Sequence, residues 1–229
     1  MGEFIALTAE DGHGFDAYRA APQGPAKAGL LVIQEIFGVN GHIQSVCDAF
    51  AADGYLAIAP AIFDRKQRKV DLGYTAETVA EGRALKDDVG WVDPVPDMQA
   101  GLAALRTELG AAAKIGVVGY CWGGTLAWLA ACRLETDCVI GYYGGQIGQF
   151  IDEQPRSPTM LHFGSEDAGI PLDSVEAIRA AHEDVEIHIY DGAGHGFACD
   201  QRADYHPTAT ALARERSMAH FAKHLGRKI

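Results

Sequence analysis

The chain has 229 residues, of which 48% are hydrophobic and 22% are charged, and its formal net charge at pH 7 is −12. This composition is ordinary for a globular protein and excludes a disordered, fibrous or coiled-coil chain, and the length fits one domain over residues 1–229. The excess of acidic residues disfavours nucleic acid and anionic membranes, so neither is expected as a partner.

The first half of the sequence predicts a hairpin followed by alternating strands and helices. Alternating residues on both sides of the Asp11-Gly12 turn predict a β-hairpin over residues 3–20. The polar and basic residues 64–73 are expected to form a solvated surface loop. Short apolar runs predict buried strands, and apolar residues at helical spacing predict helices: strands at 29–33 and 55–59, and helices at 43–54, 75–89 and 96–110.

The second half continues the alternation of short apolar strands with helices. The strands are expected at 114–118, 138–142, 159–163 and 185–190, and the helices at 123–134, 172–182 and 207–225. This order predicts an α/β fold with a mostly parallel central sheet, flanked by helices and carrying the hairpin as an antiparallel edge. Because ligands bind at the carboxyl ends of parallel strands, chemistry is expected in the loops after Ile33, Val118, Phe163 and Tyr190.

The loop at residues 119–124, Gly-Tyr-Cys-Trp-Gly-Gly, lies between a predicted strand and a predicted helix. It has the form of a nucleophile elbow in which Cys121 replaces serine, and the helix N-terminus favours a thiolate there. The alternative is a buried structural cysteine in an ordinary turn. Cys47, Cys132 and Cys138 have no comparable context and are expected in the core or on a helix face.

A thiol nucleophile requires a base and a group that orients the base. His195 stands out among nine histidines because it lies in a glycine-rich loop directly after a predicted strand. The other eight are expected at strand walls, on the surface, in turns or at polar helix positions. Either Glu166 or Asp167 could supply the orienting carboxylate. The chain order of Cys121, acid and His195 is the order of α/β-hydrolases.

Several motifs together resemble the dienelactone hydrolase family, which consists of cysteine-dependent members of the α/β-hydrolase superfamily. The resemblance extends over nearly the whole chain and rests on residues 34–40, 119–124, 141–144 and 194–197, and on Asp167 with Ile170-Pro171. It favours Asp167 over Glu166 as the acid.

The resemblance implies a role for each of these residues. Cys121 would be the nucleophile, His195 the base and Asp167 the group that orients the base. The backbone N–H groups of Ile36 and Trp122 would form the oxyanion hole.

Glu35 matches an additional carboxylate of the family. The resemblance implies that Glu35 holds the resting thiol protonated and away from His195 until substrate binds. The alternative is a strand-end carboxylate that is satisfied by local hydrogen bonds.

Two arginines of the family that bind the substrate carboxylate are not matched. Cys199 stands at one of these positions, and Arg83 lies about one turn away from the other, while Arg202 could reach the site from a loop. Loss of bidentate guanidinium contacts would weaken the binding of an anionic lactone.

Aromatic residues near the nucleophile predict a more apolar substrate pocket. These residues are Phe37, Trp91, Trp122 and Tyr143. Neutral small esters are therefore expected to be better substrates than anionic lactones.

The sequence thus predicts a hydrolase of small carboxylic esters or lactones that forms an acyl-enzyme and uses neither a metal nor a cofactor. Five cysteines without CxxC spacing and no apparent signal peptide predict a reduced, cytoplasmic protein, as a monomer or homodimer. Two alternatives stay open: a non-catalytic binding module with the same fold, and a thiol redox protein that uses Cys121.

Overall fold

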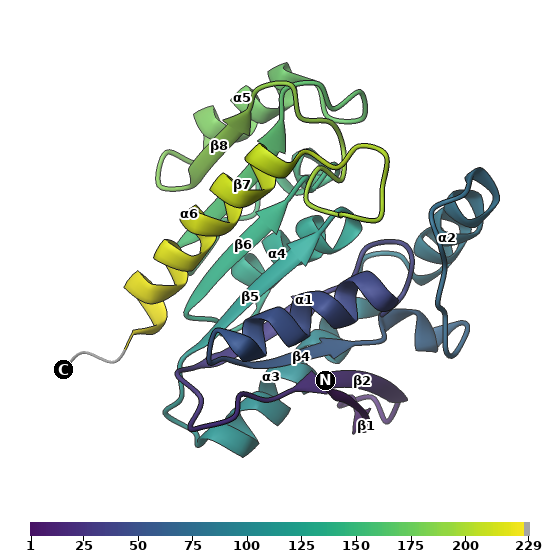
Figure 1. Cartoon of the computed structure of the whole chain (residues 1–229), viewed down its shortest axis with the longest axis vertical. Coiled ribbons are helices and arrows are strands. Elements are labelled where there is room, and N and C mark those ends of the chain that lie inside the picture. Colours follow the sequence, from purple (N-terminus) through teal and green to yellow (C-terminus); the bar gives the residue numbers. More distant parts are fainter. Residues whose placement is uncertain (227–229) are drawn as a thin grey trace.

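A computed structural model describes residues 1–226 and shows one eight-stranded sheet in the order β1-β2-β4-β3-β5-β6-β7-β8 (Figure 1). The antiparallel hairpin pairs with β4 in an antiparallel manner, and every other neighbouring pair in the sheet is parallel. The strands are β1 (Glu3–Thr8), β2 (Gly14–Ala20), β3 (Gly29–Ile33), β4 (Leu56–Pro60), β5 (Ile115–Tyr120), β6 (Cys138–Tyr142), β7 (Thr159–Gly164) and β8 (Glu186–Tyr190).

Helices cover both faces of this sheet. Helices α1 and α6 pack on one face, and α3 and α4 pack on the other (Figure 1). The helices are α1 (Gly41–Ala52), α2 (Ala76–Val89), α3 (Pro94–Leu109), α4 (Trp122–Arg133), α5 (Leu172–Ala181) and α6 (Pro207–Leu225), with short 3₁₀ turns η1 (Ile62–Arg65) and η2 (Ile147–Phe150). None of the helices in residues 1–226 combines the length and apolar character that a membrane crossing requires.

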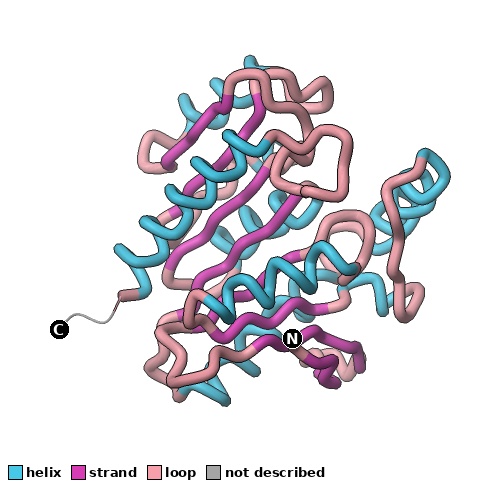
Figure 2. Tube along the Cα trace, in the orientation of Figure 1, coloured by secondary structure: helices cyan, strands magenta, loops and turns pink. Residues whose placement is uncertain are grey.

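The core lies on both faces of the central strands. All residues of β3, β4, β5 and β6 are buried, which explains why these segments are continuous apolar runs rather than alternating ones. The predicted α/β-hydrolase architecture is confirmed, with element ends that differ from the predictions by one or two residues. Long loops gather at the carboxyl ends of the parallel strands (Figure 2), and the site is built there.

The prediction of a solvated loop over residues 64–73 was wrong at its beginning. Arg65 donates two hydrogen bonds, of 2.8 and 2.7 Å, to the fully buried carboxylate of Asp97 in α3, and a third of 2.7 Å to Asp11 in the hairpin turn. A buried carboxylate is costly without such a partner. The basic side chain therefore joins the hairpin to α3 instead of facing only solvent.

Several histidines are also more buried than the sequence predicted. His42, His162, His182 and His220 all lie in the interior. His42, His182 and His220 were expected in turns or at polar helix positions, and the structure buries all three. The ring of His162 lies within 2.8 Å of the Tyr190 hydroxyl and 3.0 Å of the Ser217 hydroxyl, and burial lowers its pKa well below the ordinary value.

Candidate active site

Cys121 occupies the turn between β5 and α4 in a strained backbone conformation. Its φ is 55° and its ψ is −117°, a region that costs a non-glycine residue about 1–3 kcal/mol. Two backbone hydrogen bonds hold the turn in this conformation. The Cys121 N–H donates to the Tyr142 carbonyl at 3.0 Å, and the Cys121 carbonyl accepts from the Gly124 N–H at 2.9 Å. The strain thus presents a partly exposed thiol at the start of α4.

Close packing explains the glycines two positions before and after Cys121. A Cβ atom on Gly119 would lie 1.8 Å from the Gly123 carbonyl oxygen. One on Gly123 would lie 2.4 Å from the Gln34 carbonyl oxygen. Both contacts are with backbone atoms, which cannot move aside as a flexible side chain can. The turn at Cys121 therefore tolerates no side chain at either position.

Three loops bring a thiol, an imidazole and a carboxylate into line. The Sγ atom of Cys121, after β5, lies 3.1 Å from Nε2 of His195, after β8. The Nδ1 atom of His195 lies 2.7 Å from Oδ2 of Asp167, after β7. Asp167 is buried and its Oδ1 accepts a 2.8 Å hydrogen bond from the Gly169 N–H, whereas Glu166 is exposed. The loop sequence alone left Glu166 and Asp167 open and the family resemblance favoured Asp167, which the structure places against the imidazole.

The electrostatics of this row favour a charged imidazole. Burial lowers the pKa of His195, but the negative charge of Cys121 and the hydrogen bonds to Asp167 and Cys121 outweigh it and raise the pKa to about 10. Below that pH the imidazolium form of the ring is therefore favoured beside the Cys121 sulfur.

We expect the pKa of His195 to fall well below 10 when Cys121 is replaced by alanine. The substitution removes the charge and one hydrogen bond that favour the proton, while burial continues to oppose it. A pH titration of the ring signals by ¹H–¹⁵N NMR, on the wild type and Cys121→Ala, measures this difference. An unchanged pKa would mean that Asp167 alone holds the proton on the ring.

A hollow of about 430 Å³ opens over the thiol, and Cys121, His195 and Asp167 line it. Ile36, from the loop after β3, and Trp122, at the first position of α4, also line this hollow. Within residues 1–226, the backbone N–H groups of Ile36 and Trp122 donate to no carbonyl or side chain. Two free N–H groups beside a nucleophile are what an oxyanion hole requires.

The five residues predicted to contact substrate divide into two groups. Phe37 and Arg83 line the hollow. Trp91, Tyr143 and Cys199 do not: Trp91 packs on Phe150, and Tyr143 and Cys199 are fully buried.

Charged side chains form part of the wall of this hollow, beside the apolar ones. Arg83, Lys86, Asp87, Arg202 and Asp204 all line it with Phe37. Lys86 was missed by sequence reasoning, although it lies on the same helix as Arg83 and less than one turn further on.

Most of these cations already have carboxylate partners. Lys86 lies 2.8 Å from Asp87, and Arg202 lies 3.6 Å from both Glu35 and Asp204. Arg83 is exposed and has no carboxylate within 4.0 Å in residues 1–226. Among the cations that line the hollow in residues 1–226, only Arg83 is thus free to meet an anionic substrate without breaking an existing ion pair.

Glu35 is almost completely buried, and neither carboxylate oxygen has a hydrogen-bond partner in the described part of the chain. The nearest cation is Arg202, whose Nη1 lies 3.6 Å from Oε1. The alternative of a strand-end carboxylate satisfied by local hydrogen bonds does not hold. The implied resting state is also different, because the Cys121 thiol lies against His195 rather than away from it.

Comparisons with known proteins find similar sequences and similar folds. The sequence profile of the dienelactone hydrolase family matches residues 15–225. The carboxymethylenebutenolidase of Pseudomonas putida is 30% identical over 228 residues, which cover 95% of each chain. At 19% identity, a dienelactone hydrolase-like promiscuous phosphotriesterase from metagenomic libraries superposes with a TM-score of 0.73 over 98% of this chain and 99% of that one. An esterase of Pyrococcus furiosus, which is 15% identical, superposes with a TM-score of 0.70 over 98% of this chain and 93% of that one. The last two show the fold alone.

Proposed function

Because the chain belongs to the dienelactone hydrolase family of ester and lactone hydrolases, we propose that it cleaves small carboxylic esters or lactones with Cys121 as the nucleophile. One observation carries the proposal: the Cys121 sulfur, held on a strained elbow, lies 3.1 Å from His195 Nε2, and Asp167 binds the other ring nitrogen. This is the arrangement of nucleophile, base and orienting acid that acyl transfer requires.

Acylation begins with attack of the Cys121 thiolate on the carbonyl carbon of the substrate. A carbon–sulfur bond forms, and the carbonyl electron pair moves to oxygen, which accepts hydrogen bonds from the N–H groups of Ile36 and Trp122. The electron pair on oxygen then re-forms the carbonyl double bond, and the ester carbon–oxygen bond breaks. The leaving oxygen takes the proton from Nε2 of His195. In a lactone the leaving oxygen stays attached to the acyl group.

In deacylation the same imidazole accepts a proton instead of donating one. In the thioester the sulfur carries no charge, so the main contribution that raises the pKa of His195 is gone and the ring can act as a base. Nε2 takes a proton from water while its oxygen adds to the thioester carbon. The carbon–sulfur bond then breaks, a carboxylic acid leaves, and the thiolate–imidazolium pair returns.

Two observations favour this proposal over the alternatives. A binding module has no need of an aligned thiol, imidazole and buried carboxylate. A redox protein needs a second thiol near Cys121, but Cys121 is the only cysteine that lines the hollow within residues 1–226, and Cys199 is fully buried.

The direct test is turnover. Wild-type protein treated with a chelator should hydrolyse p-nitrophenyl acetate and open a small neutral lactone with kcat/KM above about 10⁴ M⁻¹s⁻¹ for its better substrates. Absence of turnover with every member of a panel of small esters and lactones would overturn the proposal.

Neutral substrates should be preferred to anionic ones. Arg202 and Lys86 are engaged with carboxylates, which leaves Arg83 as the cation that a substrate carboxylate can meet. We expect higher kcat/KM for the neutral member of a matched ester pair that differs only in one carboxylate. Arg83→Gln should lower kcat/KM for the anionic member about tenfold, the effect of losing one charge-assisted hydrogen bond.

Lys86→Gln is the matched control, because Lys86 is on the same helix and its charge is already paired. It should change neither substrate's kcat/KM more than about twofold. A wild-type preference for the anion would contradict the prediction, and its persistence in Arg83→Gln would point to Arg202 as the cation that binds the substrate.

A further inference from the structure

Three potential metal ligands converge behind the proposed oxyanion loop, outside the row formed by Cys121, His195 and Asp167. Glu35 follows β3, His42 lies in the first turn of α1, and Cys199 lies in the loop between β8 and α6. One ligand atom from each lies within 4.8 Å of the other two. All three side chains are buried.

Two of these side chains carry polar atoms that nothing in residues 1–226 satisfies. Both oxygens of Glu35 and Nε2 of His42 are buried without a hydrogen-bond partner. Such orphaned atoms are rare, because each forfeits its bonds to water. Two orphaned groups that come from separate segments of the chain and face one thiol indicate a ligand between them.

We propose that Glu35, His42 and Cys199 form a binding site for a divalent transition-metal ion of the zinc type. Sulfur and imidazole nitrogen are the donors that such ions select over Mg²⁺ or Ca²⁺. A carboxylate, a thiolate and a neutral imidazole around a divalent ion sum to zero charge, which suits a buried site. Arg202, 3.6 Å from Glu35, adds a positive charge that its second partner, Asp204, balances.

The geometry requires only small movements. Ligand atoms around tetrahedral zinc lie about 3.3–3.6 Å apart, so separations that are all within 4.8 Å need to close by no more than about 1.5 Å. The Tyr74 hydroxyl lies beside the Cys199 sulfur and receives a hydrogen bond of 3.1 Å from Asn40. Its own proton is thus available to the sulfur, as an outer partner of a metal-bound thiolate.

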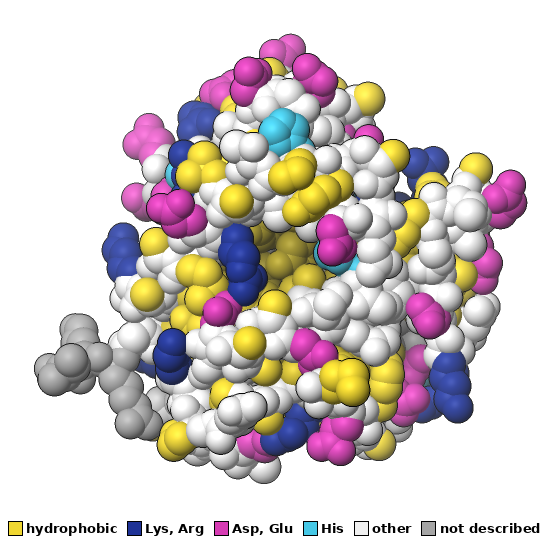
Figure 3. Space-filling view, in the orientation of Figure 1, with side chains coloured by type: hydrophobic (Ala, Val, Ile, Leu, Met, Phe, Trp, Pro, Cys, Tyr) yellow, Lys and Arg dark blue, Asp and Glu magenta, His cyan; other side chains and the backbone are white. Residues whose placement is uncertain are grey.

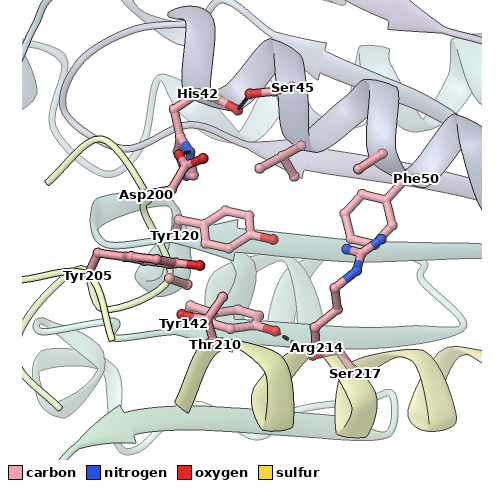
Figure 4. A pocket seen from close by; sticks show the side chains of 13 residues that line it. His42, Ser45, Phe50, Tyr120, Tyr142, Asp200, Tyr205, Thr210, Arg214 and Ser217 are labelled. Carbon is pink, nitrogen blue, oxygen red and sulfur yellow. Dashed lines mark hydrogen bonds and ion pairs between the residues drawn. The ribbon is translucent and has the colours of Figure 1, made fainter. Parts of the chain in front are cut away.

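The surroundings of His42 also fit a ligand. Its Nδ1 lies 3.7 Å from the Asp200 carboxylate (Figure 4), and ligating histidines commonly turn their second nitrogen toward such a group. His42 and Asp200 line a hollow of about 270 Å³ between α1 and α6. Figure 3 shows this face of the molecule hollowed, with hydrophobic side chains on the floor of the hollow. The hollow supplies an entry path from solvent to the His42 ring.

Cobalt(II) is the probe for this site, because a thiolate ligand gives it an intense charge-transfer absorption. The test uses the Cys121→Ala protein, so that the active-site thiol cannot contribute. We expect one equivalent of Co²⁺ to produce the thiolate band, and Zn²⁺ to displace it stoichiometrically. Absence of the band in this protein would overturn the proposal.

Second substitutions in the Cys121→Ala protein identify the ligands. Cys199→Ser should abolish the band, and His42→Ala should weaken Zn²⁺ binding more than about 100-fold, beyond the usual effect of losing an outer partner. Cys132→Ser, which removes another buried thiol, should leave the band unchanged. A band that survives Cys199→Ser would also overturn the assignment. Esterase activity is measured without metal, so failure here leaves the proposed function untouched.

Discussion

Replacing Cys121 with alanine should lower kcat for p-nitrophenyl acetate by at least about 10⁴-fold without unfolding the protein. The substitution removes the atom that forms the acyl-enzyme, and the free N–H groups of Ile36 and Trp122 can supply only a small residual rate. Because alanine tolerates the positive φ of this turn no worse than cysteine, the fold should persist. Steady-state kinetics and thermal unfolding of the purified variant measure both effects.

Cys132→Ala is the matched control for the loss of a thiol. Cys132 is buried in α4, and its thiol donates to the Glu153 carbonyl at 3.6 Å. This variant should lose some stability but keep kcat within about twofold, since the change is far from the hollow. A folded Cys121→Ala protein that retains more than a few per cent of wild-type kcat would show that another group attacks the ester.

Asp167→Asn should reduce kcat about 10⁴-fold, whereas Glu166→Gln should change it less than about threefold. Only Asp167 lies against the imidazole, at 2.7 Å from Nδ1, with a side chain shielded from water. An asparagine there can present its N–H₂ group and stabilise the wrong tautomer of His195. Glu166 is adjacent in sequence but exposed, so it provides a control for charge alone.

Two further readouts separate a positioning role of Asp167 from a structural one. The pKa of His195 should fall in Asp167→Asn, because the carboxylate is among the groups that raise it. The melting temperature should change little in comparison with kcat. If Glu166→Gln proves the more damaging substitution, the orienting acid has been assigned to the wrong residue.

The sequence predicted nearly all of the fold because its main signals are local. The apolar run at 29–33 and the turn at Asp11-Gly12 each specify an element without reference to distant residues. The ion pair of Arg65 is a contact that local sequence signals could not predict. Its partner, Asp97, is 32 residues away, so nothing beside Arg65 in the chain indicates that it joins the hairpin to α3 rather than facing solvent.

The row of Cys121, Asp167 and His195 was also predictable, since each residue follows a strand and glycines mark two of the three loops. The pocket wall was not. Side-chain direction decides that Trp91 packs on Phe150, that Cys199 faces Glu35 and His42, and that Arg202 reaches the hollow. Spacing along the chain carries little information about any of these contacts.

Trapping of the acyl-enzyme tests the central claim most directly. Wild-type protein is mixed with p-nitrophenyl acetate, quenched in acid during the first turnovers, digested and analysed by mass spectrometry. The account predicts one acetyl group per chain, on the peptide that contains Cys121 and on its sulfur. Turnover with no acetyl group on Cys121 at any quench time, or acetylation confined to another residue, would contradict it.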